Sequence, residues 1–149
     1  MNETDLHFFI DSTINYFDIM TKVKIETGIP YLSNGKPIAL EFTGIIGVSG
    51  QRKGSIYLTT SAEMLIEISE TAIGIENPKS EDIKDLVGEI TNTISGNVRQ
   101  VYGDNFMISV PVVIEGKPKD IKMPSDINSF VIPMKWKKYP LYLVVCLEH

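Results

Sequence analysis

The chain has 149 residues, of which 14 are basic and 19 acidic, so its formal net charge is −5. This length fits one domain that can bury a core without covalent or metal cross-links. The single cysteine, Cys146, excludes a disulfide-built fold and favours a reducing compartment. The acidic balance argues against a nucleic-acid partner, because phosphate binding needs clustered Lys and Arg.

Neither a signal peptide nor a membrane span is predicted. Glu3 and Asp5 stand where a signal peptide would carry a basic flank. No apolar run approaches the roughly 20 residues that a membrane helix needs. We therefore expect a cytoplasmic protein with one domain over residues 1–146 and no membrane partner. Residues 147–149 look like the start of a vector-encoded polyhistidine tail and are set aside as an expression-tag remnant.

The first part of the chain predicts a helix followed by two strands. Apolar residues recur at helical spacing from Leu6 to Met20, and this helix should end before Gly28. β-Branched residues predict strands over 38–48 and 55–60, joined by a polar hairpin loop. The glycines of this region do not have phosphate-loop spacing, so we interpret them as bulges and a hairpin turn: Gly44, Gly47, Gly50 and Gly54.

Two helices and three strands are expected next. Ser61 should cap a helix that reaches Ile73, and Ser80 should cap one that runs from about Glu81 to Val101. A loop over 117–129 is expected between the later elements, which are strands over 105–114, 126–137 and 139–146. The resulting order is one helix, two strands, two helices and three strands. Grouped strands of this kind predict an α+β fold with three helices and a largely antiparallel β-sheet.

Most catalytic constellations are absent from the sequence. The histidines are His7 and His149, which are too few for a clustered metal site. Cys146 follows two valines in a predicted strand, where a small core residue is expected rather than a nucleophile. No histidine lies near a serine in an elbow motif, so the sequence does not support triad hydrolysis.

One face of the helix predicted over 81–101 could act on a partner. Its apolar residues recur at steps of three and four and should face the sheet. Glycine costs roughly 1 kcal/mol relative to alanine inside a helix, so the two glycines on this face need a reason. Close approach of another backbone is one reason, and packing within the chain is the other. The stripe consists of Asp85, Gly88, Glu89, Asn92 and Gly96.

The run from Asp85 to Asn97 resembles the signature helix of the CheX branch of the CheC/CheX/FliY chemotaxis phosphatases. The family pattern is an Asp or Ser, three further residues, a Glu, two further residues and an Asn. The chain matches this pattern at Asp85, Glu89 and Asn92. A family proline in a following strand has Pro111 as its candidate, although only 18 residues separate it from Asn92, fewer than in the fuller pattern. The order of elements also resembles a CheC-like fold.

The resemblance implies a phosphatase that hydrolyses the aspartyl phosphate of a CheY-type response regulator. Asn92 would orient the attacking water, because a neutral carboxamide offers an acceptor and donors without repelling the phosphoryl group. Glu89 would pair with the regulator's active-site lysine. Asp85 would either assist docking or cap the helix, and Gly88 and Gly96 would contact the partner. The Mg²⁺ would belong to the regulator, so the chain would need no cofactor of its own.

The resemblance further implies a homodimer joined through sheet edges. The strand that ends at Cys146 and the one near Phe130 are both candidates for that edge. A CheD-like regulator is a further candidate partner, and the sequence leaves its role open. The alternative to an enzyme is a catalytically silent CheX-like binding module for a response regulator or signalling assembly. An unrelated α+β domain is the third hypothesis. The intact pair of Glu89 and Asn92 favours the enzyme, because a pure binder has no evident need for the asparagine.

Overall fold

The computed structural model describes residues 3–116 and 129–148. The loop expected over 117–129 and the start of the strand expected from Asp126 therefore lie almost wholly outside the described residues. The helices are α1 (Glu3–Thr21), α2 (Ala62–Ile68), the π-helical turn η1 (Ser69–Ile73) and α3 (Ser80–Tyr102). The strands are β1 (Glu26–Thr27), β2 (Tyr31–Leu32), β3 (Phe42–Gly50), β4 (Gly54–Thr60), β5 (Phe106–Ile108), β6 (Val112–Glu115), β7 (Phe130–Trp136) and β8 (Tyr139–Leu147).

The described strands form one eight-stranded sheet in the order β1-β7-β8-β4-β3-β5, with β2 also beside β7 and β6 also beside β3. Every pairing is antiparallel, which confirms the predicted α+β class with an antiparallel sheet. The two-residue strands β1 and β2 were not predicted. Leu147, which the sequence assigns to the tag remnant, is buried and pairs with Gly54 as the last residue of β8.

The sheet order overturns both strands suggested as the dimer edge. β8, which contains Cys146, lies inside the sheet between β4 and β7. Phe130 is also paired on both sides, with Val145 in β8 and with Leu32 in β2. Among the described residues the less protected edge is instead formed by β5 and β6, each of which pairs only with β3.

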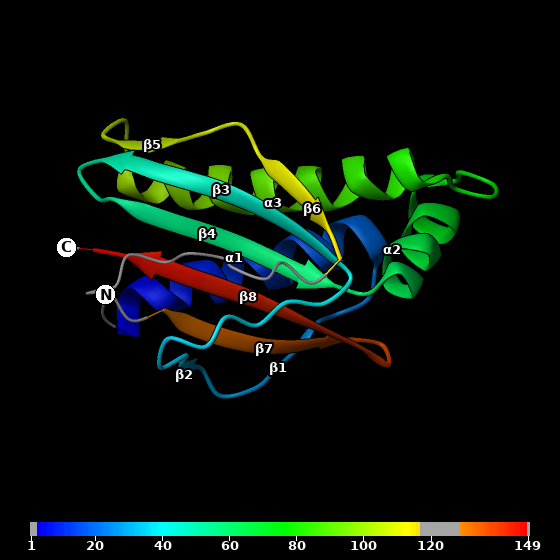
Figure 1. Cartoon of the computed structure of the whole chain (residues 1–149), viewed down its shortest axis with the longest axis horizontal. Coiled ribbons are helices and arrows are strands. Elements are labelled where there is room, and N and C mark those ends of the chain that lie inside the picture. Colours follow the sequence, from blue (N-terminus) through cyan, green and yellow to red (C-terminus); the bar gives the residue numbers. More distant parts are fainter. Residues whose placement is uncertain (1–2, 117–128, 149) are drawn as a thin grey trace.

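Helices α1 and α3 lie side by side on one face of the sheet, and α2 lies at one end of it (Figure 1). The main core fills the space between these helices and the sheet, and includes Phe9, Phe17, Val87, Ile90 and Leu143. The opposite face of the sheet carries a smaller buried cluster of Tyr57, Val131 and Val144. No helix in the part of the chain that the structure describes has the length and apolar character to cross a membrane.

Helices α1 and α3 run antiparallel and are joined by buried polar contacts. Near the start of α1, the buried Asp5 carboxylate accepts hydrogen bonds from the Tyr102 hydroxyl at the end of α3 and from Arg52 Nη1, the latter at 3.2 Å. One to two turns further along α1, Ser12 Oγ donates to the Ile94 carbonyl oxygen at 3.2 Å. These contacts fix which residues of the two helices lie opposite one another.

The strand expected over 105–114 is divided into β5 and β6 by a bulge. Ile108 pairs with Val48 and Val112 pairs with Ile45, so four steps along this edge match three steps along β3. The additional residue lies between Ser109 and Pro111, and proline has no N–H to continue the ladder. Pro111 and Val113 both face α3, where a β-carbon at Gly88 would meet them.

The register of β3 against β4 is uninterrupted from Phe42↔Thr60 to Val48↔Gly54, so the bulges expected at Gly44 and Gly47 are wrong. The hairpin turn is confirmed, because Gly50 and Gly54 end and begin the paired strands with positive φ angles of 92° and 153°. Gly44 is needed for a different reason. A β-carbon there would lie 2.5 Å from the Thr91 hydroxyl oxygen of α3, which means that glycine permits the close approach of β3 and α3.

Of the two N-cap residues predicted from the sequence, one is confirmed and the other is wrong. Ser61 caps α2 as expected, because its side chain accepts from the Met64 N–H at 3.3 Å. Ser80 is instead the first residue of α3 and Lys79 is its N-cap. Asp82 Oδ2 accepts from the Lys79 N–H at 2.8 Å, so Asp82 provides the side-chain hydrogen bond at this end.

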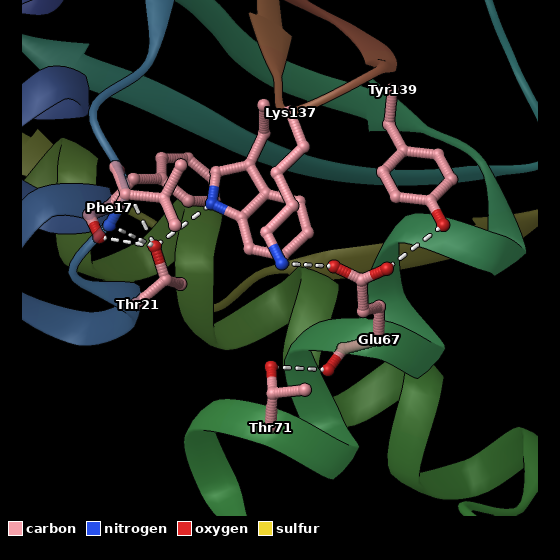
Figure 2. Close-up of polar contacts among 8 residues, drawn as sticks. Phe17, Thr21, Glu67, Thr71, Lys137 and Tyr139 are labelled. Carbon is pink, nitrogen blue, oxygen red and sulfur yellow. Dashed lines mark hydrogen bonds and ion pairs between the residues drawn. The ribbon is translucent and has the colours of Figure 1, made fainter.

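A polar network connects the end of α1 and α2 to the β7–β8 hairpin (Figure 2). Trp136 Nε1 donates to Thr21 Oγ1 at 2.9 Å. Lys137 Nζ forms an ion pair with Glu67 Oε2 at 2.7 Å, and the Tyr139 hydroxyl donates to the other Glu67 oxygen at 3.2 Å. The hairpin is therefore fastened to both helices at one end of the sheet.

Candidate functional site

Helix α3 presents Asp85, Glu89 and Asn92 on one exposed line. The three residues are separated by four and three positions, which places their side chains on one helical face. All three are exposed, whereas Ile90 and Ile94 of the same helix are completely buried. The three side chains form no hydrogen bond or ion pair with other described residues. The pair Glu89 and Asn92 is therefore accessible to a partner molecule.

The backbone beneath this face is held rigidly. Thr91 is fully buried, and its hydroxyl donates to the Val87 carbonyl oxygen at 2.8 Å. The same hydroxyl lies close to Gly44 of β3, so α3 is pressed onto the sheet at the residue before Asn92. A helix fixed in this way holds Asn92 and Glu89 at a constant separation, which a site acting by placement requires.

The two glycines of the stripe lie in different surroundings. Gly88 is buried, and a β-carbon there would be 3.1 Å from Val113 Cγ2 and 3.8 Å from Pro111 Cγ. Packing of β6 within the chain therefore explains Gly88. At Gly96 a β-carbon would meet nothing within 4 Å. Packing among the described residues gives no reason for glycine at position 96, where the predicted contact with a partner remains a prediction.

Strand β6 packs against α3 on one side of the exposed residues Asp85, Glu89 and Asn92. Pro111, the candidate for the family proline, lies in the bulge next to Gly88, the residue before Glu89. Lys84 Nζ forms an ion pair with Glu115 Oε2 at 3.2 Å, which joins the far end of β6 to α3. Both side chains are about half exposed, so this pair contributes little to the stability of the fold.

Helix α1 packs against α3 on the other side and contributes a residue that sequence reasoning missed. Tyr16 lies near Glu89: burial of its hydroxyl, reinforced by the Glu89 carboxylate, raises the pKa of Tyr16 to about 12. Tyr16 is not one of the apolar residues that recur at helical spacing in α1. The sequence also contains no signal for which residues of α1 and α3 face each other. The hydrogen bond from Ser12 to Ile94 supplies that register.

The remaining candidates lie apart from this face. His7 is exposed and lies 3.8 Å from Glu3, and Cys146 is buried in β8. Among residues 3–116 and 129–148, no group of three or more His, Cys, Asp and Glu side chains could hold a metal ion.

A shallow hollow of about 350 Å³ lies beside α2 and is lined by Glu63, Ile66, Glu67, Glu70, Thr71 and Tyr139. None of these residues belongs to the stripe on α3.

Three helices beside an antiparallel sheet are the fold of the CheC-like proteins, which this chain matches over its whole length. The model of the family described as chemotaxis phosphatase CheX matches residues 42–135, which include all of α3. The chain belongs to the CheX family of chemotaxis phosphatases. No curated protein sequence matches it.

Solved structures of similar chains agree with this assignment. A CheC-like superfamily protein from Shewanella sp. PV-4 is 29% identical, with both chains fully covered and a TM-score of 0.86. The chemotaxis protein CheX from Vibrio vulnificus is 25% identical, with 97% of this chain and 99% of that chain covered and a TM-score of 0.85. A CheX from Borrelia burgdorferi, solved with CheY, BeF₃ and Mg²⁺, shares the fold at 21% identity, with 97% of each chain covered and a TM-score of 0.77.

Proposed function

We propose that this chain hydrolyses the aspartyl phosphate of a CheY-type response regulator. The observation that carries the proposal is the exposed, unpartnered pair of Glu89 and Asn92 on a helix face that the fold leaves uncovered. Membership of the CheX family and the CheX–CheY complex from Borrelia burgdorferi support the choice of partner. The chemistry itself is derived from the side chains present.

Asn92 is proposed as the catalytic residue that places a water in line with the phosphorus. Its carboxamide oxygen accepts a hydrogen bond from the water and so aims the oxygen lone pair at phosphorus. The bond from phosphorus to the aspartyl oxygen breaks as the water oxygen attacks, which yields inorganic phosphate and a free carboxylate. An acyl phosphate is already activated, so placement supplies most of the required catalysis.

Glu89 is proposed as the docking residue. Its carboxylate would form an ion pair with the active-site lysine of the regulator and thereby set the register of Asn92 over the phosphoryl group. Asp85, one turn earlier on the same line, would extend this contact. The Mg²⁺ of the reaction would be held by the regulator's own carboxylates, which leaves this chain with positioning alone.

The test follows the decay of a phosphorylated CheY-type regulator with and without the chain. We expect faster loss of phosphate with the wild-type chain and the spontaneous rate with Asn92→Ala. Asn97→Ala is the matched control, because Asn97 is an exposed asparagine on the same helix but outside the stripe. An unchanged decay rate alongside measurable binding would replace the enzyme with a binding module.

The role of Glu89 needs a separate measurement. Glu89→Ala should weaken binding of the regulator and leave turnover at saturating regulator largely intact, whereas Glu76→Ala, at an exposed residue before α3 begins, should change neither. Loss of turnover at saturation with unchanged binding would contradict the docking role and would make Glu89 part of the chemistry.

A homodimer formed through the β5–β6 edge is also part of the proposal. Its support is that Val110 and Val112 on this edge are 82% and 60% exposed, and Met107 is 50% exposed. Unpaired strand edges bearing apolar side chains associate readily with a second copy. Sedimentation should show a dimer that Val112→Lys converts to a monomer, and a wild-type monomer at micromolar concentration would contradict this part.

A further inference from the structure

The hydroxyl of Tyr16 is buried without a hydrogen-bond partner among the described residues. Its ring packs edge-on against Phe17, with the ring centres 5.3 Å apart. A buried donor without a partner loses its hydrogen bonds to water and gains none in return, so native proteins contain few of them. A donor kept at this cost needs an explanation beyond packing, because phenylalanine would fill the same space.

The packing of α1 on α3 places Tyr16 opposite the turn of α3 that carries Glu89. The antiparallel register runs from Asp5 opposite Tyr102 to Ser12 opposite Ile94. Four more residues along α1, and about as many back along α3, bring Tyr16 opposite the turn that carries Glu89. The Glu89 carboxylate is close enough to raise the pKa of Tyr16 further above its ordinary value than burial alone does. Among the described residues, an unpartnered donor on α1 therefore lies within electrostatic reach of an unpartnered carboxylate on α3.

We infer that Tyr16 is a positioning residue whose hydroxyl donates a hydrogen bond to the Glu89 carboxylate when Glu89 engages the cationic group of the docked partner. The inference rests on the proposed function, since that function supplies the cation, a lysine ammonium. It extends the function by assigning a residue on α1 to a site otherwise formed by α3.

The reason that this bond forms on docking lies in desolvation. In the free chain Glu89 is exposed and its carboxylate is hydrated by bulk water. A docked ammonium neutralises one carboxylate oxygen and excludes that water, so the second oxygen needs a donor. The Tyr16 hydroxyl is already buried and held by α1, so it loses little entropy on forming the bond. A hydrogen bond to an ionised group is about twice as strong as a neutral one, which favours this arrangement.

A first experiment tests the proximity without requiring any partner. The ionisation of Tyr16 in the free chain is followed by NMR of ring-labelled tyrosine. Glu89→Gln should lower the pKa of Tyr16 from its value of about 12, since it removes the neighbouring negative charge. Glu81→Gln, at the start of α3, should leave the titration unchanged. An unaltered titration in Glu89→Gln would overturn the inference, because the two groups would then not interact.

A second experiment measures the coupling in a complex. The probes are CheY-type receiver domains of the source organism, each loaded with beryllofluoride and Mg²⁺. Tyr16→Phe should weaken binding about ten- to a hundredfold, the loss of one hydrogen bond to a charged group. In the Glu89→Ala background the same substitution should have no further effect. The stability of Tyr16→Phe should equal or exceed that of the wild type, a combination that a merely structural tyrosine would not give.

The outcomes separate this inference from the proposed function. Tyr142→Phe, which alters a tyrosine on the opposite face of the sheet, should leave binding unchanged. The chain could bind the receivers without accelerating phosphate loss, while Tyr16→Phe and Glu89→Ala weaken binding non-additively. That result would support the inference and contradict the phosphatase. Accelerated phosphate loss with additive Tyr16 and Glu89 effects would overturn the inference and leave the phosphatase standing. A chain that binds none of the receivers would overturn both.

Discussion

Gly44 of β3 and Thr91 of α3 approach each other so closely that no β-carbon fits between them. A β-carbon at position 44 would be 2.5 Å from the Thr91 hydroxyl oxygen and 2.9 Å from the Val87 carbonyl oxygen. The Thr91 hydroxyl cannot move away easily, because it is buried and bonded to that same carbonyl. This contact presses the helix onto the sheet at the residue next to Asn92.

Gly44→Ala should therefore destabilise the chain by about 1–3 kcal/mol, the usual cost of forcing an additional carbon into a packed contact. The substitution should also lower activity on a phosphorylated regulator, because it shifts the backbone that carries Asn92. Gly47→Ala is the control on the same strand, where the nearest atom would be at an ordinary 3.5 Å. Denaturant unfolding of the two variants measures the difference, and equal stabilities would contradict the importance of this contact.

Gly96→Ala should stabilise the chain by about 0.5–1 kcal/mol, the gain in helix propensity at a position where the methyl group meets nothing. Gly88→Ala should gain less or lose stability, because its methyl group would crowd Val113 at 3.1 Å. Unfolding of both variants in urea gives the comparison.

Partner contact at Gly96 needs a larger side chain to test it. Gly96→Leu should keep the fold and weaken binding of a CheY-type regulator, because the leucine would project where the partner approaches α3. Binding as tight as that of the wild type would show that position 96 lies outside the interface. The glycine would then have no explanation in docking.

Periodicity was sufficient to predict the major elements of the fold. The apolar steps of α1 and α3 and the β-branched runs of β3, β4 and β8 are long enough for their periods to be unambiguous. The strands β1 and β2 are two residues long and exposed, so they leave no pattern. The division between β5 and β6 had a signal in Pro111, since a proline inside a predicted strand indicates a bulge or an edge.

The site was predictable only where one helix contains it. Spacing alone places Glu89 and Asn92 together, because residues three apart share a helical face. Gly88 could not be assigned, since its contact with Val113 depends on how a strand 25 residues later crosses the helix. Tyr16 was missed for the same reason: its proximity to Glu89 arises from helix packing, which no local pattern encodes. The two strands suggested as sheet edges proved to be paired on both sides, because strand order, unlike strand position, is a tertiary property.

Acidification should weaken the connection between α2 and the β7–β8 hairpin. The hydrogen bond from Lys137, helped by the one from Tyr139, lowers the pKa of Glu67 below its ordinary value of 4.5 (Figure 2). A carboxyl whose pKa is lower in the folded state stabilises the fold above pH 4.5, and this contribution is lost as the pH falls through the folded pKa. The free energy of unfolding of Glu67→Gln should therefore decrease less than that of the wild type between about pH 5 and 3. Glu70→Gln, at an exposed carboxyl in the same hollow, should retain the wild-type profile.

Alkaline conditions should destabilise the chain through Tyr16. Its pKa is raised from 10.0 to about 12 in the folded state, so the folded chain keeps its full stability with respect to this ionisation below pH 10 and loses stability as the pH rises towards 12. A shift of this size corresponds to roughly 2–3 kcal/mol at most. Tyr16→Phe cannot ionise, and its free energy of unfolding should fall less than that of the wild type between pH 9 and about 11. Urea unfolding at stepped pH measures both chains, and the difference between them isolates Tyr16 from Tyr102, whose pKa is also raised. If the free energy of unfolding fell equally with pH in the wild type and in Tyr16→Phe, the Tyr16 hydroxyl would ionise as freely in the folded chain as in the unfolded one. That result would contradict the raised pKa of the buried hydroxyl.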